Sequence, residues 1–282
     1  YRFGNSNLPF EGTIDFNGYK LIKDFKNTTQ PAIDTTSENA VIENVVAEVY
    51  IDNEIESSAM KTIVNNNYGI IRNIQIQVKE CNQNPNSGMC LIANTNNGTI
   101  DNFYIKLEVP LYGDINIGLA CQGNNSIVKN GYMYGEDIYI TNKATTNKNV
   151  GGLVCGNNSD GIVENVYVTN KVNFIEEKND VTVANIVGLN GQRATVRNCY
   201  TYESGEKNIS NSGPGIGNTY NAAIAENVYY FAGDIKNNSY NIKTTPLALY
   251  DTTFQNQILN TYEAFDIENT VTQGYYPQLK MP

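Results

Sequence analysis

The sequence contains no histidine, which removes the commonest general base and the most frequent zinc ligand. Serine-hydrolase triads and the H-E-x-x-H zinc motif both need histidine, so this chain can form neither. Its five cysteines include no C-x-x-C pair, so neither a zinc cage nor a redox motif is indicated. The sequence therefore predicts no catalytic residues, no metal site and no cofactor.

Basic residues are also scarce. There are 19 Lys and Arg residues against 29 Asp and Glu, and the formal net charge is −10. Without a basic stripe to neutralise phosphates, nucleic acid is excluded as a partner. No run of about 20 apolar residues occurs, so we expect no membrane insertion by this segment. The first residues carry neither an initiator methionine nor a signal-peptide pattern, so we expect a fragment whose targeting signals lie elsewhere.

What the sequence does contain is a repeat. An apolar residue, any residue and an asparagine form a short phrase, followed by apolar residues at every second position, as in Ile74, Ile76 and Val78. Alternation of this kind is typical of a β-strand and not of a helix. The phrase occurs seven times, with spacings of 28–35 residues between its asparagines: Asn44, Asn73, Asn102, Asn130, Asn165, Asn198 and Asn227.

The alternation changes phase at each of these asparagines. Inward residues are expected two positions before the Asn and one, three and five positions after it. Such a change requires a bend or bulge, so each Asn is expected at a corner where the chain passes from one sheet to the next. Stacked in register, the asparagines would form a ladder of side-chain amides. Ligand binding by this column is the weaker alternative.

A second phrase, rich in small residues, precedes most copies by about ten residues, as at 118–121 and 151–155. Each repeat thus supplies at least two strands and several turns, which make one coil of a solenoid. A β-sandwich would need hairpins every 8–12 residues or so, which these spacings disfavour. We predict an all-β fold, a right-handed parallel β-helix of about seven coils over residues 1–233. Residues 234–282 are expected to form a C-terminal capping segment of the same domain.

Tyrosine recurs two positions after the corner, on the outward face. Five successive coils carry it there, at Tyr104, Tyr132, Tyr167, Tyr200 and Tyr229, and a neighbouring outward column holds Tyr134 and Tyr202. Because tyrosine combines apolar area with a hydroxyl group, such rows can stack on sugar rings or form the centre of a protein interface. The alternative is that the stacked rings only stabilise adjacent strands.

The remaining reactive residue types favour structural roles. Cys121, Cys155 and Cys199 occupy positions typical of small buried hydrophobic residues. Cys81 and Cys90 bracket a polar loop, which they would close as a disulfide in an oxidising compartment; two free thiols are an equal alternative. Acidic side chains are scattered, without the paired carboxylates of glycosidases, so a solvated acidic surface is the better interpretation.

Residues 151–157 and 161–167 resemble the GLUG repeat, named for a Gly-Leu-x-Gly phrase, with Cys155 where that phrase usually has glycine. Residues 9–19 resemble the opening phrase of this family, and residues 274–280 resemble its closing phrase. The resemblance implies a β-helix like those of bacterial surface adhesins and of the non-catalytic regions of IgA-protease-like zinc metallopeptidases. The closing phrase is most similar to the latter group.

Together these observations lead us to expect a non-catalytic recognition, adhesion or substrate-binding module. The resemblance implies a secreted or cell-surface location, with anchoring through parts outside this fragment, and a host protein such as immunoglobulin, or a glycan, as the partner. A free-standing glycan-binding adhesin is the second candidate. A polysaccharide-cleaving β-helix enzyme is the third and weakest.

Overall fold

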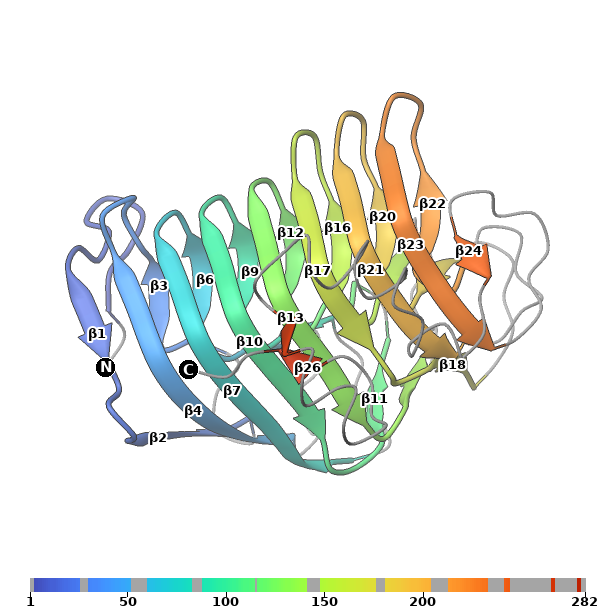
Figure 1. The fold of residues 1–282 in the computed structure, drawn as a ribbon. Coiled ribbons are helices and arrows are strands. Elements are labelled where there is room, and N and C mark those ends of the chain that lie inside the picture. The colour runs from blue at the N-terminus through green and yellow to red at the C-terminus, as the bar shows by residue number, and fades with distance from the viewer. Residues whose placement is uncertain are drawn as a thin grey trace.

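A computed structural model shows an all-β chain whose parallel strands stack into a solenoid of about six turns, close to the predicted seven coils (Figure 1). The structure describes residues 3–25, 30–51, 60–82, 88–114, 116–140, 148–175, 181–203, 213–232, 241–243, 265–266 and 278–279. No helix occurs within these ranges, and therefore none that could span a membrane. The predicted parallel β-helix is confirmed.

The largest sheet has ten strands and holds the long strand of each coil. These long strands, which follow one another along the axis in Figure 1, are β4 (Val41–Ile51), β7 (Ile70–Cys81), β10 (Thr99–Leu107), β13 (Ile127–Gly135), β17 (Ile162–Val168), β21 (Thr195–Glu203) and β23 (Ile224–Ala232). At one end β1 (Thr13–Asp15) and β2 (Lys20–Asp24) pair with β4, and at the other β24 (Ile242–Lys243) pairs with β23.

A second sheet of seven short strands lies behind the first in Figure 1. Its strands are β3 (Ile33–Thr35), β6 (Val64–Asn67), β9 (Ala93–Asn96), β12 (Cys121–Asn124), β16 (Val154–Asn157), β20 (Val187–Asn190) and β22 (Ile216–Thr219). Smaller parallel sheets complete the coils: β11 (Leu111–Gly113), β14 (Ile138–Ile140) and β18 (Val172–Phe174); β15 (Lys148–Gly151) with β19 (Val181–Ala184); and β5 (Met60–Lys61) with β8 (Met89–Cys90). One antiparallel pair is formed by β25 (Phe265–Asp266) and β26 (Gln278–Leu279).

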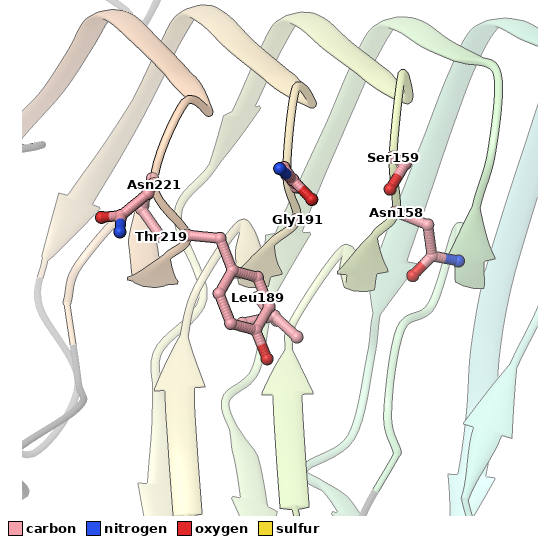
Figure 2. A pocket seen from close by; sticks show the side chains of 8 residues that line it. Asn158, Ser159, Leu189, Gly191, Thr219 and Asn221 are labelled. Atoms are coloured by element: carbon pink, nitrogen blue, oxygen red, sulfur yellow. The ribbon is translucent and has the colours of Figure 1, made fainter.

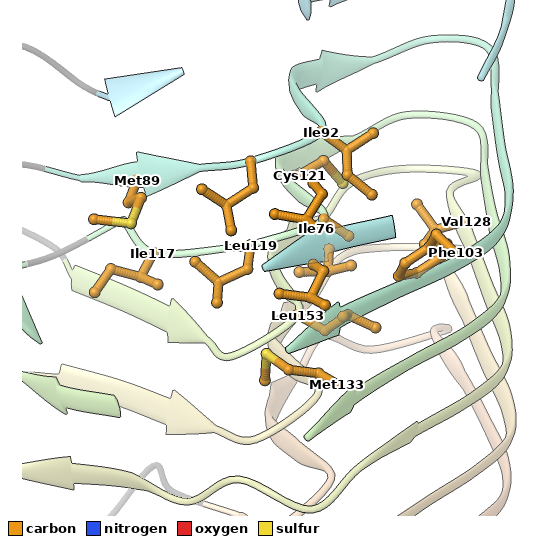
Figure 3. Close-up of a cluster of buried hydrophobic side chains, with 14 of the residues drawn as sticks. Ile76, Met89, Ile92, Phe103, Ile117, Leu119, Cys121, Val128, Met133 and Leu153 are labelled. Carbon is orange, nitrogen blue, oxygen red and sulfur yellow. The ribbon is translucent and has the colours of Figure 1, made fainter. Parts of the chain in front are cut away.

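The predicted inward positions form the core. In the coil of Asn73, Ile71, Ile74, Ile76 and Val78 are all buried. Side chains from different coils converge on one interior, as Figure 3 shows for Ile76, Leu119, Leu153 and Met133. A single coil cannot bury this apolar face, so each coil depends on its neighbours.

The asparagine of each phrase adopts the left-handed backbone conformation. All seven have φ between 51° and 57°, a region that Asn tolerates better than most other residues. The structure corrects the predicted corner between two sheets, because both arms at Asn44 belong to the single strand β4. A single left-handed residue shifts the phase of the alternation without ending the strand, because the hydrogen-bond ladder resumes on its other side.

Charges alternate in sign from coil to coil at the position before each of these asparagines. The column runs Glu43, Arg72, Asp101, Lys129, Glu164, Arg197 and Glu226, with each residue in register with the next. Nη2 of Arg72 lies 2.6 Å from Oε2 of Glu43, and Nζ of Lys129 lies 3.5 Å from Oδ2 of Asp101. Opposite charges on paired residues of neighbouring coils favour this register. Pairing a coil with the next coil but one would instead place like charges opposite each other.

At the C-terminal end of the stack, a later residue covers the last short strand. The Asn241 side chain accepts hydrogen bonds from the backbone N–H groups of Gly215 and Ile216, each at 2.9 Å, and donates one to the Ile216 carbonyl. The predicted capping role of residues 234–282 as a whole stays a prediction, since most of that segment lies outside the described residues.

Candidate recognition surface

The predicted tyrosine column exists. Tyr104, Tyr132, Tyr167, Tyr200 and Tyr229 lie in register on successive long strands. The rings of Tyr132 and Tyr167 stack with centroids 5.0 Å apart and planes 4° apart, and those of Tyr167 and Tyr200 with 5.0 Å and 7°. Tyr104 stacks on Tyr132 at 5.3 Å. The coil spacing of about 4.8 Å thus sets a stacking distance that suits aromatic rings.

Burial divides the tyrosine column. Tyr167 is only 2% exposed and Tyr200 is 0% exposed, although both occupy outward positions of the sheet. Tyr104, Tyr132 and Tyr229 are half-buried. β26 contacts β13, the strand of Tyr132, so part of the outer face of this sheet carries a second layer of chain (Figure 1). The middle of the tyrosine column is therefore packing surface, and a partner can reach only its half-buried members.

Of the neighbouring outward column, predicted at Tyr134 and Tyr202, the structure describes one side chain. Tyr134 is half-buried and packs against Tyr132 with ring centroids 5.5 Å apart. Tyr202 lies in β21, but its side chain is outside the part of the chain that the structure describes. Tyr104 donates a hydrogen bond to Oε1 of Gln75 at 2.7 Å, which ties the end of the column to the preceding coil.

Burial raises the pKa of the Tyr132 and Tyr167 hydroxyls, and their tyrosine neighbours raise it further. In the unfolded chain these groups would ionise near pH 10. As the pH rises above about 10, the unfolded state loses protons before the folded state does, so we expect the free energy of unfolding to fall. Tyrosinate absorbance during an alkaline titration should show a late step that is smaller in Tyr167→Phe. Titration of all tyrosines in one step near pH 10, before unfolding, would contradict the burial.

The predicted ladder of corner asparagines is present with two interruptions. Nδ2 of Asn73 donates to Oδ1 of Asn44 at 3.0 Å, and Asn102 continues to Asn73 at 2.9 Å. Asn130 instead donates to Oδ1 of Asp101. The remaining links join Asn165 to Asn130 and Asn227 to Asn198. Oδ1 of Asn165 is buried without a hydrogen-bond partner, which marks the second interruption.

A second ladder, which our sequence analysis missed, is buried between the sheets. Nδ2 of each residue donates to Oδ1 of the next at 2.8–2.9 Å, in the order Asn67, Asn96, Asn124, Asn157 and Asn190. The same amides also donate to backbone carbonyls of the turns, as Asn124 does to Ser126 and Ile162. The signal was visible in the sequence, because an Asn precedes the corner Asn by six residues in the early coils and by eight residues later.

The turns after this buried ladder form a row in which four of six members are exposed, Gly191 is buried and Asn97 is half-buried; we call it the turn row. It comprises the residue that follows each buried Asn or its equivalent: Tyr68, Asn97, Asn125, Asn158, Gly191 and Tyr220. At the centre of the turn row, side-chain amides of neighbouring turns hydrogen-bond to one another. Nδ2 of Asn158 donates to Oδ1 of Asn125 at 2.8 Å, and Nδ2 of Asn125 donates to Oδ1 of Asn97 at 2.7 Å. The last turns are two residues longer and extend beyond the earlier ones in Figure 1.

A hollow of about 500 Å³ opens where the turn row has lengthened (Figure 2). Figure 2 shows that Asn158 and Ser159, Gly191, and Asn221 come from three successive turns. Its lining contains no charged side chain and consists of Asn158, Ser159, Leu189, Gly191, Gln192, Thr219, Tyr220 and Asn221. Sequence analysis did not find this site, because its members are turn and strand-end residues without a catalytic pattern.

The acidic side chain next to the hollow in sequence, Asp160, is engaged in an ion pair, and so are Glu48 and Glu108 in earlier coils. Arg193 reaches both carboxylate oxygens of Asp160, at 2.9 and 2.7 Å. This hydrogen bond lowers the pKa of Asp160. Lysine partners likewise lower the pKa of Glu48 and Glu108. A carboxyl that acts as a general acid in glycosidases needs a raised pKa, so these shifts run in the wrong direction for that chemistry.

The five cysteines are free thiols, so Cys81 and Cys90 do not form the disulfide that their spacing allowed. Burial raises the pKa of Cys81 to about 11 and that of Cys90 to about 12, which makes both poor nucleophiles. Cys121, Cys155 and Cys199 are buried, as predicted. Among the described residues, no group of three or more His, Cys, Asp or Glu side chains is placed to hold a metal ion.

Comparison with known proteins supports one part of the resemblance. The family model of the GLUG motif matches residues 146–173, which include β15, β16 and β17. No curated protein matches the chain. The motif and the stacked parallel strands together support a GLUG-repeat β-helix, which is a repeat module.

Proposed function

We propose that this chain is the non-catalytic recognition module of a secreted or cell-surface bacterial protein. The observation that carries the proposal is the surface of the solenoid, where in-register coils repeat uncharged polar and aromatic side chains at fixed spacing. A rigid repeat scaffold of this kind suits the recognition of extended partners. Its partner is a host protein such as immunoglobulin, or a glycan.

The phrases at residues 9–19 and 274–280 support a more specific assignment. Both resemble phrases of the GLUG-repeat proteins, and the closing phrase is most similar to that of IgA-protease-like zinc metallopeptidases, so we assign the chain to a region of such a protein that grips or displays substrate. The second candidate, a free-standing glycan-binding adhesin, is favoured by the uncharged hollow in the turn row. The lowered pKa values of Glu48, Glu108 and Asp160 weigh against the third, a polysaccharide-cleaving enzyme.

The immobilised chain, probed with human immunoglobulins A and G and with a glycan array, tests the proposal. We expect saturable binding to at least one immunoglobulin or glycan. The same preparation, incubated with polysaccharides, should release no new reducing ends. Absence of binding in every arm would overturn the recognition role, and release of reducing ends would revive the enzymatic alternative.

A further inference from the structure

The hollow in the turn row lies where three turns stack, and the middle turn carries a glycine at the position of the row. Asn157, Asn190 and Thr219 are in register, so the residues that follow them, Asn158, Gly191 and Tyr220, occupy equivalent places in three stacked turns. Gly191 contributes no side chain between Asn158 and Tyr220. The two flanking positions lie two coil spacings apart, or roughly 10 Å. The gap is therefore bounded by an amide on one side and an aromatic residue on the other.

Backbone contacts hold these three turns in place before any ligand arrives. In each turn the first carbonyl accepts a hydrogen bond from the N–H three residues later, at 2.9 Å from Gly161, 3.1 Å from Ala194 and 3.1 Å from Ala223. The third residue of each has a positive φ, as in a type II turn: Asp160, Arg193 and Ala222. Gly191 and Tyr220 also donate backbone hydrogen bonds to the preceding coil. A preorganised site loses less conformational entropy on binding.

The polar groups of the hollow have unused hydrogen-bonding capacity. Nδ2 of Asn158 is engaged with Asn125, but its Oδ1 makes no hydrogen bond within the described residues. The side chains of Gln192 and Asn221 make none there either. Oγ1 of Thr219 is buried without a partner, and a buried unpaired hydroxyl is uncommon in a folded protein. Three carboxamides and a serine hydroxyl thus face the opening with donors and acceptors available.

The charges around the hollow favour a neutral ligand over an anionic one. No lining residue is charged, and Arg193, the cation that follows Gln192 in the chain, donates hydrogen bonds to both carboxylate oxygens of Asp160. The net charge of −10 disfavours anionic ligands. Tyr220 is 55% exposed beside Leu189, which lines the hollow, so an apolar platform adjoins the amides. Carboxamides, hydroxyls and an exposed ring complement the hydroxyl groups and the C–H faces of a sugar.

We infer that this hollow binds a neutral saccharide, with Tyr220 as the stacking platform and with Asn158, Gln192 and Asn221 hydrogen-bonding to its hydroxyl groups. The inference rests on the proposed recognition function and names its ligand class and site. It differs from a site on the tyrosine column, because the turn row lies on the other side of the corner asparagines and shares no residue with that column.

Isothermal titration with neutral oligosaccharides tests the site, using cellotriose, triacetylchitotriose, mannotriose and lactose as probes. Sialyllactose and a heparin tetrasaccharide serve as anionic probes. We expect at least one neutral probe to bind and Tyr220→Ala to weaken it by about tenfold or more. Gln192→Ala and Asn221→Ala should each weaken it by several-fold, a factor of about five. Thermal melts of each variant check that the solenoid remains folded.

Tyr68→Ala is the matched control, because Tyr68 belongs to the same turn row and is 45% exposed but lies at its far end. Its affinity for the neutral probe should equal that of the unaltered chain. If the Tyr220→Ala variant binds the neutral oligosaccharide as tightly as the unaltered chain does, the proposed site is wrong. Binding to anionic probes or immunoglobulin alone would overturn the saccharide inference and leave the recognition function standing. No binding to any probe or immunoglobulin would overturn both.

Discussion

Replacing Asn124 by leucine is expected to lower the free energy of unfolding by about 3–5 kcal/mol, because several buried polar groups would lose their partners at about 1–3 kcal/mol each. Asn124 is 0% exposed. Its Nδ2 donates to Oδ1 of Asn157 and to two backbone carbonyls, and its Oδ1 accepts from Asn96 at 2.8 Å. Leucine has a similar volume, so the loss of hydrogen bonds dominates. Chemical denaturation followed by tyrosine fluorescence measures the change.

Asn125→Leu is the internal control for that measurement. The two asparagines are adjacent in the chain, but the Asn125 side chain is exposed, and within the described residues it bonds only to the amides of Asn97 and Asn158. Water can replace both partners, so we expect a change within about 0.5 kcal/mol. Equal destabilisation by the two substitutions would show that the buried ladder contributes no more to the free energy of unfolding than the exposed amides do.

Phe103→Ala is expected to destabilise the solenoid by about 3–5 kcal/mol, since it empties a large volume in the core. Phe103 is 2% exposed and faces Gly131 of the next coil. A Cβ built on Gly131 would lie 2.0 Å from Cζ of the Phe103 ring, so the ring extends into space that the glycine leaves open. The unfolding midpoint in urea measures the effect.

The same contact predicts a rescue. Gly131→Val alone should overpack the core and cost about 1–3 kcal/mol. Combined with Phe103→Ala, it should restore part of the lost stability, because the valine fills space vacated by the ring. A double-mutant cycle measures this coupling. Additive destabilisation in the double variant would mean that the two positions do not share one packing volume.

The repeat phrases were sufficient to predict the fold. Asparagine at spacings of 28–35 residues, with apolar residues at fixed offsets, specifies which side chains point inward. The phase change at positions such as Asn73 predicted an irregularity, and the structure shows a left-handed residue inside one strand. Local pattern carries this information because side-chain direction in a strand depends on position parity alone.

The candidate site was harder to predict. The tyrosine column was predicted from spacing, yet the burial of Tyr167 and Tyr200 could not be, because burial depends on contacts from segments distant in sequence. The hollow beside Gly191 also escaped prediction. Its lining comes from three turns that are distant in the sequence and lie side by side only because Asn157, Asn190 and Thr219 are in register.

By itself, the sequence determined the β-strands, the coil repeat, the inward positions and the change of phase at the repeated asparagines, all of which follow from alternation and spacing along the chain. Only the tertiary structure decided which outward side chains stay accessible, which asparagines pair in the buried ladder and where the stacked turns leave a hollow. These properties depend on the register between coils about 30 residues apart, and on the space that neighbouring side chains leave unfilled.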